Sequence, residues 1–135
     1  MQIHVLRLPP GADLRPALEA AFVDLARTHG VSAGCIVSAV GSLSRVVLRY
    51  AAEPEGTETL APLELLTLSG TLSLDGVHLH ASVSDAQGAV TGGHLMPGSL
   101  VRTTAEVVVA LLPGWAFSRA VDGATGYREL VPRRL

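Results

Sequence analysis

Apolar and polar residues alternate along two neighbouring segments, residues 67–74 and 77–84, which meet at Asp75-Gly76. Alternation of this kind is typical of a half-buried β-strand, and Asp-Gly between two such segments predicts a hairpin. Pairing Leu74 with Val77 places apolar residues on one face and polar residues on the other. The apolar face then contains the pairs Leu72–Leu79, Gly70–Ala81 and Leu68–Val83. The polar face contains Ser73–His78, Thr71–His80, Ser69–Ser82 and Thr67–Ser84.

The polar face of this predicted hairpin carries hydroxyl groups and imidazoles but no Lys, Arg, Asp or Glu. A sheet face that meets bulk water usually carries charged side chains among its polar residues. We therefore predict that this face lines a pocket or a subunit interface.

A third histidine follows in Gly92-Gly93-His94. Even pairing of residues 90–95 with the hairpin would place His94 on the apolar side. Paired glycines are typical of a β-bulge, however, which inserts one residue and reverses the alternation. With such a bulge, His94 lies opposite His80 on the polar face and Leu95 stays on the apolar face.

The three imidazoles would then lie within reach of a single ion. Residues two apart in a strand are separated by roughly 6.7 Å, cross-strand neighbours by about 5 Å, and zinc binds imidazole nitrogen at about 2.0–2.1 Å. This arrangement favours His78, His80 and His94 as ligands of a divalent metal ion. The alternative interpretation is three separate polar residues in a hydrogen-bonded sheet.

The rest of the pattern predicts one helix and several further strands. Asp13 is placed to cap a helix from Leu14 to Thr28, and Gly30 to end it. Strands are expected at residues 2–8, 32–40, 43–50, 103–112 and 126–131, with a turn at Gly41-Ser42 and a long acidic loop at 51–62. Residues 103–112 are apolar on both faces, which predicts a central strand. One helix, many strands and no βαβ rhythm indicate an α+β fold with a mostly antiparallel β-sheet, in a single domain over residues 1–135.

Composition narrows the classes of protein that fit this pattern. The chain is 48% hydrophobic and 16% charged, against roughly 25% charged in an average domain, so we expect an oligomer that covers apolar surface. The net charge of −2 argues against the broad positive field of sequence-independent DNA binding. No apolar run is long enough to span a membrane. Cys35 is the single cysteine, so no intrachain disulfide forms. These features are typical of a cytoplasmic protein.

Several charged residues near the predicted sheet have alternative interpretations. Glu106 lies among valines of the predicted central strand, where a carboxylate needs a partner. It is either a further ligand or general base near the histidines, or it forms an ion pair with an arginine such as Arg102 or Arg119. The alternation places Glu64 on the apolar side of its sheet. Arg119 and Asp122 are expected in a turn, held by a salt bridge or an Asx-turn.

Short motifs along nearly the whole chain occur in an order that is typical of one family. They are Arg7-Leu8, Pro10-Gly11-Ala12-Asp13-Leu14, Gly41-Ser42-Leu43-Ser44-Arg45-Val46, Leu48-Arg49, Glu64-Leu65-Leu66, Leu68-Ser69-Gly70-Thr71, Gly76, His78-Leu79-His80, Gly92-Gly93-His94-Leu95, Thr104-Ala105-Glu106-Val107, Arg119, Asp122, Thr125-Gly126 and Glu129-Leu130. With these motifs the chain resembles the plants-and-prokaryotes-conserved (PPC) domain family. The resemblance implies a compact α+β domain that associates as a homotrimer. The implied fold is similar to that of acetolactate decarboxylase and of a metal-dependent ester hydrolase, which hold zinc with three histidines. It therefore implies the same role for His78, His80 and His94.

The resemblance is to the bacterial and archaeal type of this domain, which has no AT-hook. In plants the domain accompanies an AT-hook, which binds the minor groove of DNA. This chain has no Arg-Gly-Arg-Pro motif, and Ala61-Pro62-Leu63-Glu64 stands where the plant proteins have Gly-Arg-Phe-Glu. Both differences make direct DNA binding the less favoured interpretation.

The residues and the resemblance together support three hypotheses. The first is a stand-alone, homotrimeric PPC-domain protein that binds zinc or another divalent metal through the three histidines. It would have a pocket for a small ligand, with Glu106, Arg119 and Thr71 as possible neighbours of the site. The second is an interaction module that scaffolds a DNA-binding or regulatory protein partner without catalysis. The third is a zinc-dependent hydrolase or lyase.

Overall fold

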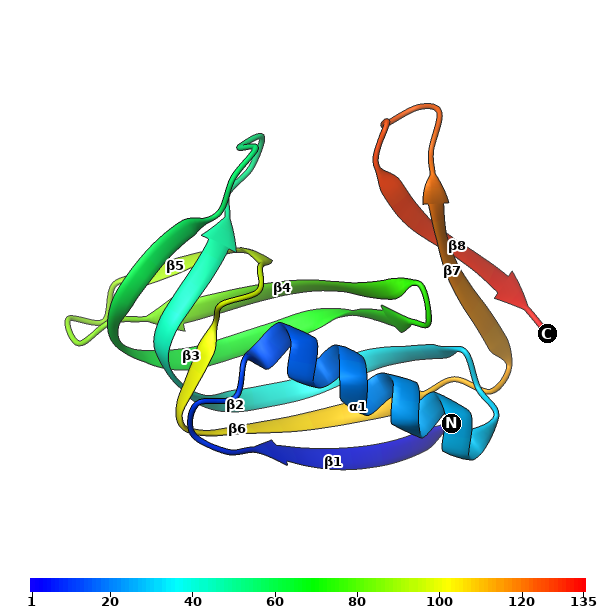
Figure 1. Ribbon diagram of the computed structural model, residues 1–135, viewed down its shortest axis with the longest axis horizontal. Helices are drawn as coiled ribbons and strands as arrows, with labels where there is room; N and C mark the ends of the chain where they lie inside the picture. The colour runs from blue at the N-terminus through cyan, green and yellow to red at the C-terminus, as the bar shows by residue number, and fades with distance from the viewer.

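A computed structural model describes all 135 residues of the protein (Figure 1). In chain order the elements are β1 (Gln2–Leu8), α1 (Leu14–His29), β2 (Ala33–Arg49), β3 (Thr57–Ser73), β4 (Gly76–Ser84), β5 (Val90–Leu95), β6 (Leu100–Leu111), β7 (Trp115–Val121) and β8 (Arg128–Arg134). Strands β1 to β6 form one antiparallel sheet in the order β1-β6-β2-β3-β4-β5, and β7 and β8 form a separate two-stranded sheet. The predicted α+β class, mostly antiparallel with one helix, is therefore confirmed. No helix has the length and apolar character required to span a bilayer.

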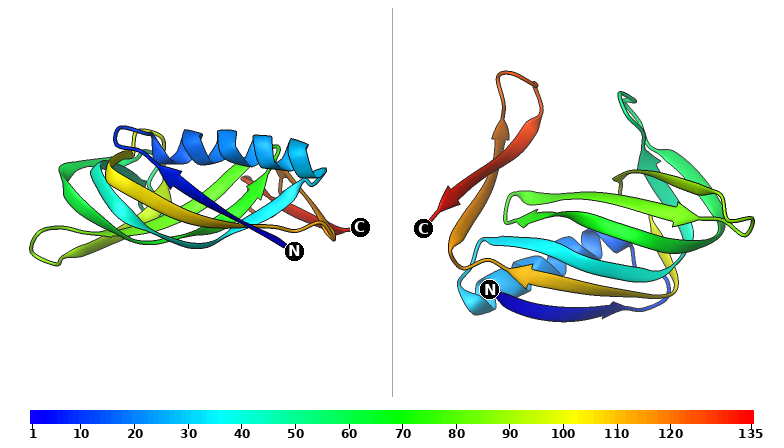
Figure 2. Two further views of the ribbon diagram at one scale, coloured as in Figure 1. Left: turned by 90° about the horizontal axis from the view of Figure 1, so that it is seen from below. Right: turned by 180° about the vertical axis from the view of Figure 1, so that it is seen from behind.

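Helix α1 lies across one face of the sheet and packs on the core from that side (Figure 2). The residues of α1 that are buried against the sheet are spaced four apart, which places them on one side of a helix; they are Leu14, Leu18, Phe22 and Ala26. The helix ends at Gly30, as predicted, and the φ of this residue is 65°, in the left-handed region that favours glycine. Asp13 precedes the helix, but its side chain does not cap it. Instead, Asp13 Oδ2 accepts a hydrogen bond of 2.8 Å from the Gly98 N–H, which ties the helix start to the loop after β5.

The sheet closes on itself at one end. Strands β2 and β3 have 17 residues each, and β2 pairs with β3, with β6 and also with β5. The pairs Leu48–Leu95 and Arg49–His94 join β2 to β5, so β2, β3, β4 and β5 form a closed ring of strands. This closure places Arg49, at the end of β2, next to the predicted metal ligand His94.

Residues 33–49 form one strand, whereas the sequence pattern predicted two strands separated by Gly41-Ser42. Gly41 is required inside the sheet, because a Cβ at this position would lie 2.3 Å from the carbonyl oxygen of Thr104 in β6. Irregular pairing with β6 bends β2 without ending it. The predicted acidic loop is also too long, because β3 already begins at Thr57. Pro62 is accommodated at an irregularity in the β2–β3 pairing.

Strands β7 and β8 form a hairpin that projects beside the main sheet, and we call it the C-terminal arm (residues 115–134; Figure 1). Arg119 and Asp122 were both expected in a turn, but Arg119 lies in strand β7, which spans residues 115–121. The turn begins at Asp122, whose Oδ1 accepts a hydrogen bond from the Ala124 N–H, as expected of an Asx-turn. The Arg119 N–H donates a hydrogen bond of 3.1 Å to Asp75 Oδ2, which attaches the arm to the turn between β3 and β4.

The sheet face opposite α1 exposes apolar side chains on β1 and β2. Ile3, Val5, Val37 and Val40 are each more than half exposed, at 51%, 73%, 56% and 53%. Strand β6 lies between these two strands and pairs with both. We call this surface the outer apolar face. A patch of this kind often marks a protein–protein contact.

Candidate metal centre

Strand β4 presents His78 and His80 on the same face, because alternate residues of a strand point to the same side of a sheet. The residues between and beside them, Val77, Leu79 and Ala81, are buried in the core. The buried residues therefore fix the strand, and the two imidazoles are left on the polar face, as the sequence predicted.

The pairing register of the β3–β4 hairpin differs from the predicted one by two residues. Thr71 pairs with His78 and Ser69 with His80, and the turn consists of residues 74 and 75, so that Gly76 begins β4 with a φ of 121°. Because the shift is even, every histidine and hydroxyl keeps its predicted face. The prediction for Glu64 was wrong: it is exposed, because an irregularity between residues 65 and 67 reverses the alternation along β3.

Strand β5 places His94 opposite His80, as predicted, but without the predicted bulge. The pairing of β4 with β5 is even from His80–His94 to Ser84–Val90. The two glycines have another role, because a Cβ on Gly93 would lie 2.8 Å from the carbonyl oxygen of Arg49 in β2. They allow β5 to approach the strands on both of its sides closely.

The three imidazoles lie close enough to share one metal ion. One ring nitrogen from each of His78, His80 and His94 lies within 4.8 Å of the other two. The Nε2 atoms of His78 and His80 are 3.2 Å apart, near the roughly 3.4 Å that separates two nitrogens bound to a tetrahedral zinc ion at about 2.1 Å. The ring centroids of His78 and His94 are 5.0 Å apart, and those of His80 and His94 5.7 Å. The donor set is thus three imidazoles without a carboxylate, which fits zinc and leaves a fourth position open.

Two of the histidines are neutral near pH 7. Burial lowers the pKa of His94 to about 4, and the neighbouring Arg15 guanidinium is the next largest cause. Burial, followed by the positive charge of Arg119, also lowers the pKa of His78. A neutral imidazole offers its lone pair without first losing a proton, so protons compete weakly with a metal ion at these positions.

Arg15 of helix α1 binds the backbone at the start of β4, where β5 does not pair with it, and at the end of β5 beside His94. Its guanidinium donates hydrogen bonds to the backbone oxygens of Leu95, at 2.8 Å, and Val77, at 3.1 Å, and forms an ion pair with Glu19 at 3.3 Å. Arg15 Nη1 also lies 3.1 Å from Nε2 of His94. A guanidinium has no acceptor atom, so Nε2 accepts here and the proton of the neutral ring is on Nδ1. A metal ion bound at Nε2 would replace this contact.

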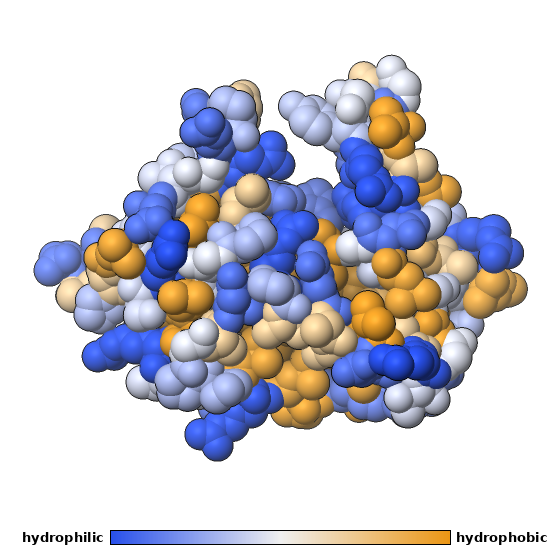
Figure 3. Space-filling view, viewed as in Figure 1, coloured by the Kyte–Doolittle hydropathy of each residue, from blue (hydrophilic) through white to orange (hydrophobic).

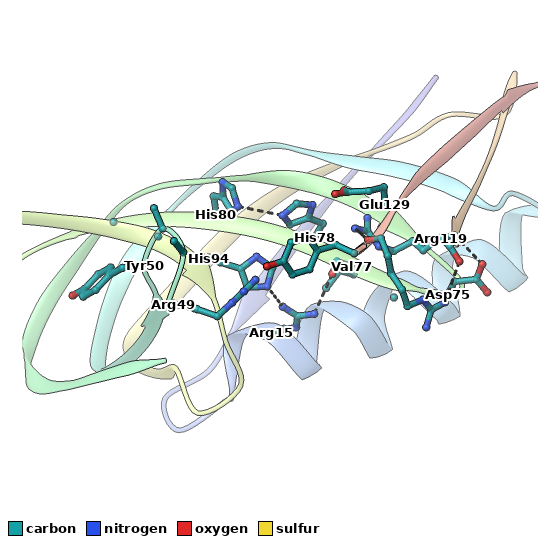
Figure 4. Close-up of a pocket in the computed structure, with 17 residues that line it drawn as sticks. Arg15, Arg49, Tyr50, Asp75, Val77, His78, His80, His94, Arg119 and Glu129 are labelled. Atoms are coloured by element: carbon teal, nitrogen blue, oxygen red, sulfur yellow. Dashed lines mark hydrogen bonds between the residues drawn. The ribbon is translucent and has the colours of Figure 1, made fainter. Parts of the chain in front are cut away.

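The histidines line a cavity of about 730 Å³. It opens between the turn after β2 and the C-terminal arm, and hydrophilic residues surround the hollow between these two projections (Figure 3). Arg49 and Tyr50 lie to one side of His78 and His94, and Arg119 and Glu129 lie to the other (Figure 4). The charged residues that line the cavity are Arg15, Arg49, Asp75, Arg119, Arg128 and Glu129.

Two of the three predicted site neighbours lie beside the histidines. Thr71 pairs with His78 and, with both histidines of β4, lines a second depression of about 130 Å³. Arg119 reaches the main cavity from β7, where its Nη2 donates a hydrogen bond of 2.8 Å to the carbonyl oxygen of Arg128. The expected salt bridge of Arg119 is absent, since it takes part in none of the three ion pairs of the protein.

Glu106, the third predicted neighbour, lies away from the histidines. It is an exposed residue of β6, next to Arg7 in the sheet, and it does not line the cavity. The reason is the strand order, which places β2 and β3 between β6 and the histidine strand β4.

Other residues of the cavity were not predicted from the sequence. Arg49 could have been found, because it ends an apolar strand and belongs to the Leu48-Arg49 motif. Arg15, Tyr127 and Arg128 carried no comparable signal. Their positions depend on how α1 and the arm pack against the sheet.

The fold and the site define a class: an antiparallel α+β domain with three converging histidines in an open, arginine-lined cavity. The chain belongs to the Plants and Prokaryotes Conserved (PCC) domain family, whose model matches residues 1–113. This is the family, also abbreviated PPC, that the sequence motifs indicated. The C-terminal arm lies beyond the matched residues.

Individual relatives agree with this assignment. The chain is 52% identical over 131 residues to the bifunctional protein GlmU of Synechococcus sp. (strain JA-2-3B'a(2-13)). The matched residues are 96% of this chain but 20% of that protein. The chain thus spans one fifth of the length of this curated relative. A hypothetical protein from Salmonella enterica has a TM-score of 0.90 and 40% identity, covering 98% of this chain and 94% of the other. A metal-containing protein from Archaeoglobus fulgidus has a TM-score of 0.77 and 32% identity, covering 97% and 94%. The similarity to α-acetolactate decarboxylase of Bacillus subtilis, with a TM-score of 0.55 and 15% identity over 81% of this chain and 52% of the other, shows a shared fold alone.

Proposed function

We propose that this protein binds a divalent metal ion, zinc being the expected ion, through His78, His80 and His94. The observation that carries the proposal is the approach of one nitrogen from each ring to within 4.8 Å of the others. The archaeal relative described as metal-containing, at 32% identity, supports it. Three protein ligands leave a position that opens into the cavity, which favours a ligand-binding role over a purely scaffolding one. When bound, such an ion would supply Lewis acidity or a water of lowered pKa to a molecule in the cavity.

Metal analysis of untagged protein and titration with Co²⁺, a spectroscopic substitute for zinc, test this proposal. We expect one equivalent per chain and nitrogen ligation. Each of His78→Gln, His80→Gln and His94→Gln should weaken binding by at least about 100-fold, more than the loss of a supporting residue around a metal site typically causes. His29→Gln is the matched control, because His29 is an exposed histidine outside the cavity. A protein that takes up no metal at pH 7.5, or variants that bind metal like the wild type, would refute the proposal.

We further infer that the chain assembles as a homotrimer through the outer apolar face. The exposed valines and isoleucine of β1 and β2 support this, since water is released when such a surface is covered by a second copy. Light scattering should give three times the 14.0 kDa mass of one chain. Val5→Asp should lower this mass, while Val23→Asp, on the exposed side of α1, should leave it unchanged. A monomer mass for the wild type at micromolar concentration would contradict the inference.

A further inference from the structure

The cavity beside the histidines is cationic, although the whole chain carries a net charge of −2. Four arginines line it, against the two carboxylates of Asp75 and Glu129. Both carboxylates already accept hydrogen bonds from the arm, Asp75 from the Arg119 N–H and Glu129 from the Thr125 hydroxyl. Of the four arginines, Arg15 alone forms an ion pair within the chain. Four arginines against two carboxylates leave an excess of positive charge in the cavity, of which Glu19 balances only the part on Arg15. An anionic ligand would balance the rest.

Two of these arginines, Arg49 and Arg119, lie on opposite sides of the histidine cluster (Figure 4). Arg49 ends β2 and is paired with His94 in the sheet. Arg119 comes from the arm, at the point where its N–H is hydrogen-bonded to Asp75 in the turn before β4. Both arginines line the cavity. The two positive charges are therefore separated along the cavity, with the histidines between them (Figure 4).

Arg49 and Arg119 are partly exposed residues, and their guanidinium groups keep donors for a ligand. Arg49 takes part in no ion pair. Arg119 uses Nη2 on the carbonyl oxygen of Arg128, while Arg128 Nη2 donates to the carbonyl oxygen of Arg119 at 3.1 Å, which holds this part of the arm in place. A guanidinium has five N–H donors in a planar fork that matches a carboxylate, so most of the donors of Arg119 remain for a second partner.

We propose that the cavity binds a small organic dianion, a dicarboxylate, with one carboxylate on Arg49 and the other on Arg119, across the three histidines. The proposal rests on the proposed metal site only for the middle of the ligand, which would lie at the three histidines. The contacts of the two carboxylates with Arg49 and Arg119 do not require the metal. Tyr50 and Tyr127 also line the cavity and offer aromatic surface to the carbon chain. Because Arg119 belongs to the arm, which lies beyond residues 1–113 of the family match, the second carboxylate position is a property of the arm.

Calorimetric titration with four defined probes tests the proposal: succinate, glutarate, butyrate and glycerol 3-phosphate. Butyrate matches succinate in length and lacks one carboxylate, and glycerol 3-phosphate carries its charge on a single group. We expect succinate or glutarate to bind at least about tenfold more tightly than butyrate, the factor that corresponds to one charge-assisted hydrogen bond. Arg49→Gln and Arg119→Gln should each remove this preference, and Arg49→Lys should restore part of it. Arg27→Gln should retain it, because Arg27 is an exposed residue of α1 outside the cavity.

Several results would overturn the proposal. These are equal affinities for butyrate and the dicarboxylates, tighter binding of glycerol 3-phosphate than of either dicarboxylate, or variants that keep the wild-type preference. A change in the mass of the assembly in both glutamine variants, without a change in dicarboxylate binding, would instead assign the two arginines to subunit contacts. Each titration is done with zinc-loaded protein and with protein dialysed free of metal. A dicarboxylate preference without zinc uptake would refute the metal proposal alone, and zinc uptake without the preference would refute the dicarboxylate proposal alone.

Discussion

Gly70→Ala tests how closely strands β3 and β4 must approach for the histidines to converge. Gly70 pairs with Leu79, between the residues that pair with His78 and His80. Its φ is 154°, and a Cβ at this position would lie 1.9 Å from the carbonyl oxygen of His78. That oxygen belongs to the backbone, so it cannot rotate away as a side chain could. The two strands would have to separate at His78, the first of the three proposed metal ligands.

Two costs add in this variant. A backbone conformation that only glycine adopts readily costs about 1–3 kcal/mol, and forcing an extra methyl group into a packed region costs typically about 1–3 kcal/mol. We therefore expect the free energy of unfolding of the metal-free protein to fall by about 2–6 kcal/mol. The metal affinity should fall by at least about tenfold, or about 1.4 kcal/mol, because His78 moves away from its partners.

Gly76→Ala is the matched control in the same hairpin. Gly76 also has a positive φ, 121°, but a Cβ on this residue would have no other atom within 4 Å. Only the backbone cost of about 1–3 kcal/mol is therefore expected, without the cost of the extra methyl group. Guanidinium unfolding of the two metal-free variants, followed by metal titration, compares them directly. If Gly70→Ala is within about 1 kcal/mol of Gly76→Ala and retains its metal affinity, the argument from close strand approach is refuted.

Three further predictions concern the surroundings of the histidines. The metal-free protein should lose stability as the pH falls from about 6.5 to 4, because the pKa of His94 is lowered to about 4 and the unfolded chain binds the proton first. Allowing for the partial exposure of His94, the loss is about 1–2 kcal/mol; denaturation at pH 7 and 4.5 measures it, and an unchanged pH dependence in His94→Gln would contradict this cause. Arg15→Met should lower the free energy of unfolding by about 2–3 kcal/mol, since the hydrogen bonds to Val77 and Leu95 are lost; thermal denaturation unchanged from the wild type would argue against this role. Leu79→Ala, at a fully buried position between His78 and His80, should lower the free energy of unfolding by about 2–5 kcal/mol, measured by urea unfolding. A decrease of less than about 1 kcal/mol would mean that the core is not packed tightly beneath the site.

The alternation of apolar and polar residues along the chain was sufficient to place two of the candidate ligands on one face of a strand. Alternation has a period of two, so His78 and His80 share a face whatever residue lies opposite them. For the same reason, the error of two residues in the predicted hairpin register did not change the face on which His78 and His80 lie. The helix could be predicted equally well, because its buried residues are spaced four apart and Gly30 ends it. Local patterns of this kind depend on neighbours in the chain, which the sequence lists directly.

The structural roles of the glycines could not be predicted without the tertiary structure. Gly41 was expected in a turn and Gly93 in a bulge, yet both lie inside strands where another backbone passes too close for a Cβ. A glycine in the sequence indicates that something unusual occurs at that position. Whether it is a turn, a bulge or a close approach depends on a strand that is distant in the chain.

The residues that line the cavity also depend on the tertiary structure. Arg49 lies next to His94 because β2 closes onto β5. Arg119 lines the same cavity as His78 because the arm is attached to the turn before β4. Arg15 reaches the same place from a helix more than sixty residues earlier in the chain. The pattern of residues within a single segment cannot predict that these arginines lie around one cavity. Their positions depend on how separate elements of the fold pack against one another. The shared face of His78 and His80 was therefore predictable from local alternation, whereas the register that places His94 beside them and the positive charge around the three histidines depend on the tertiary structure.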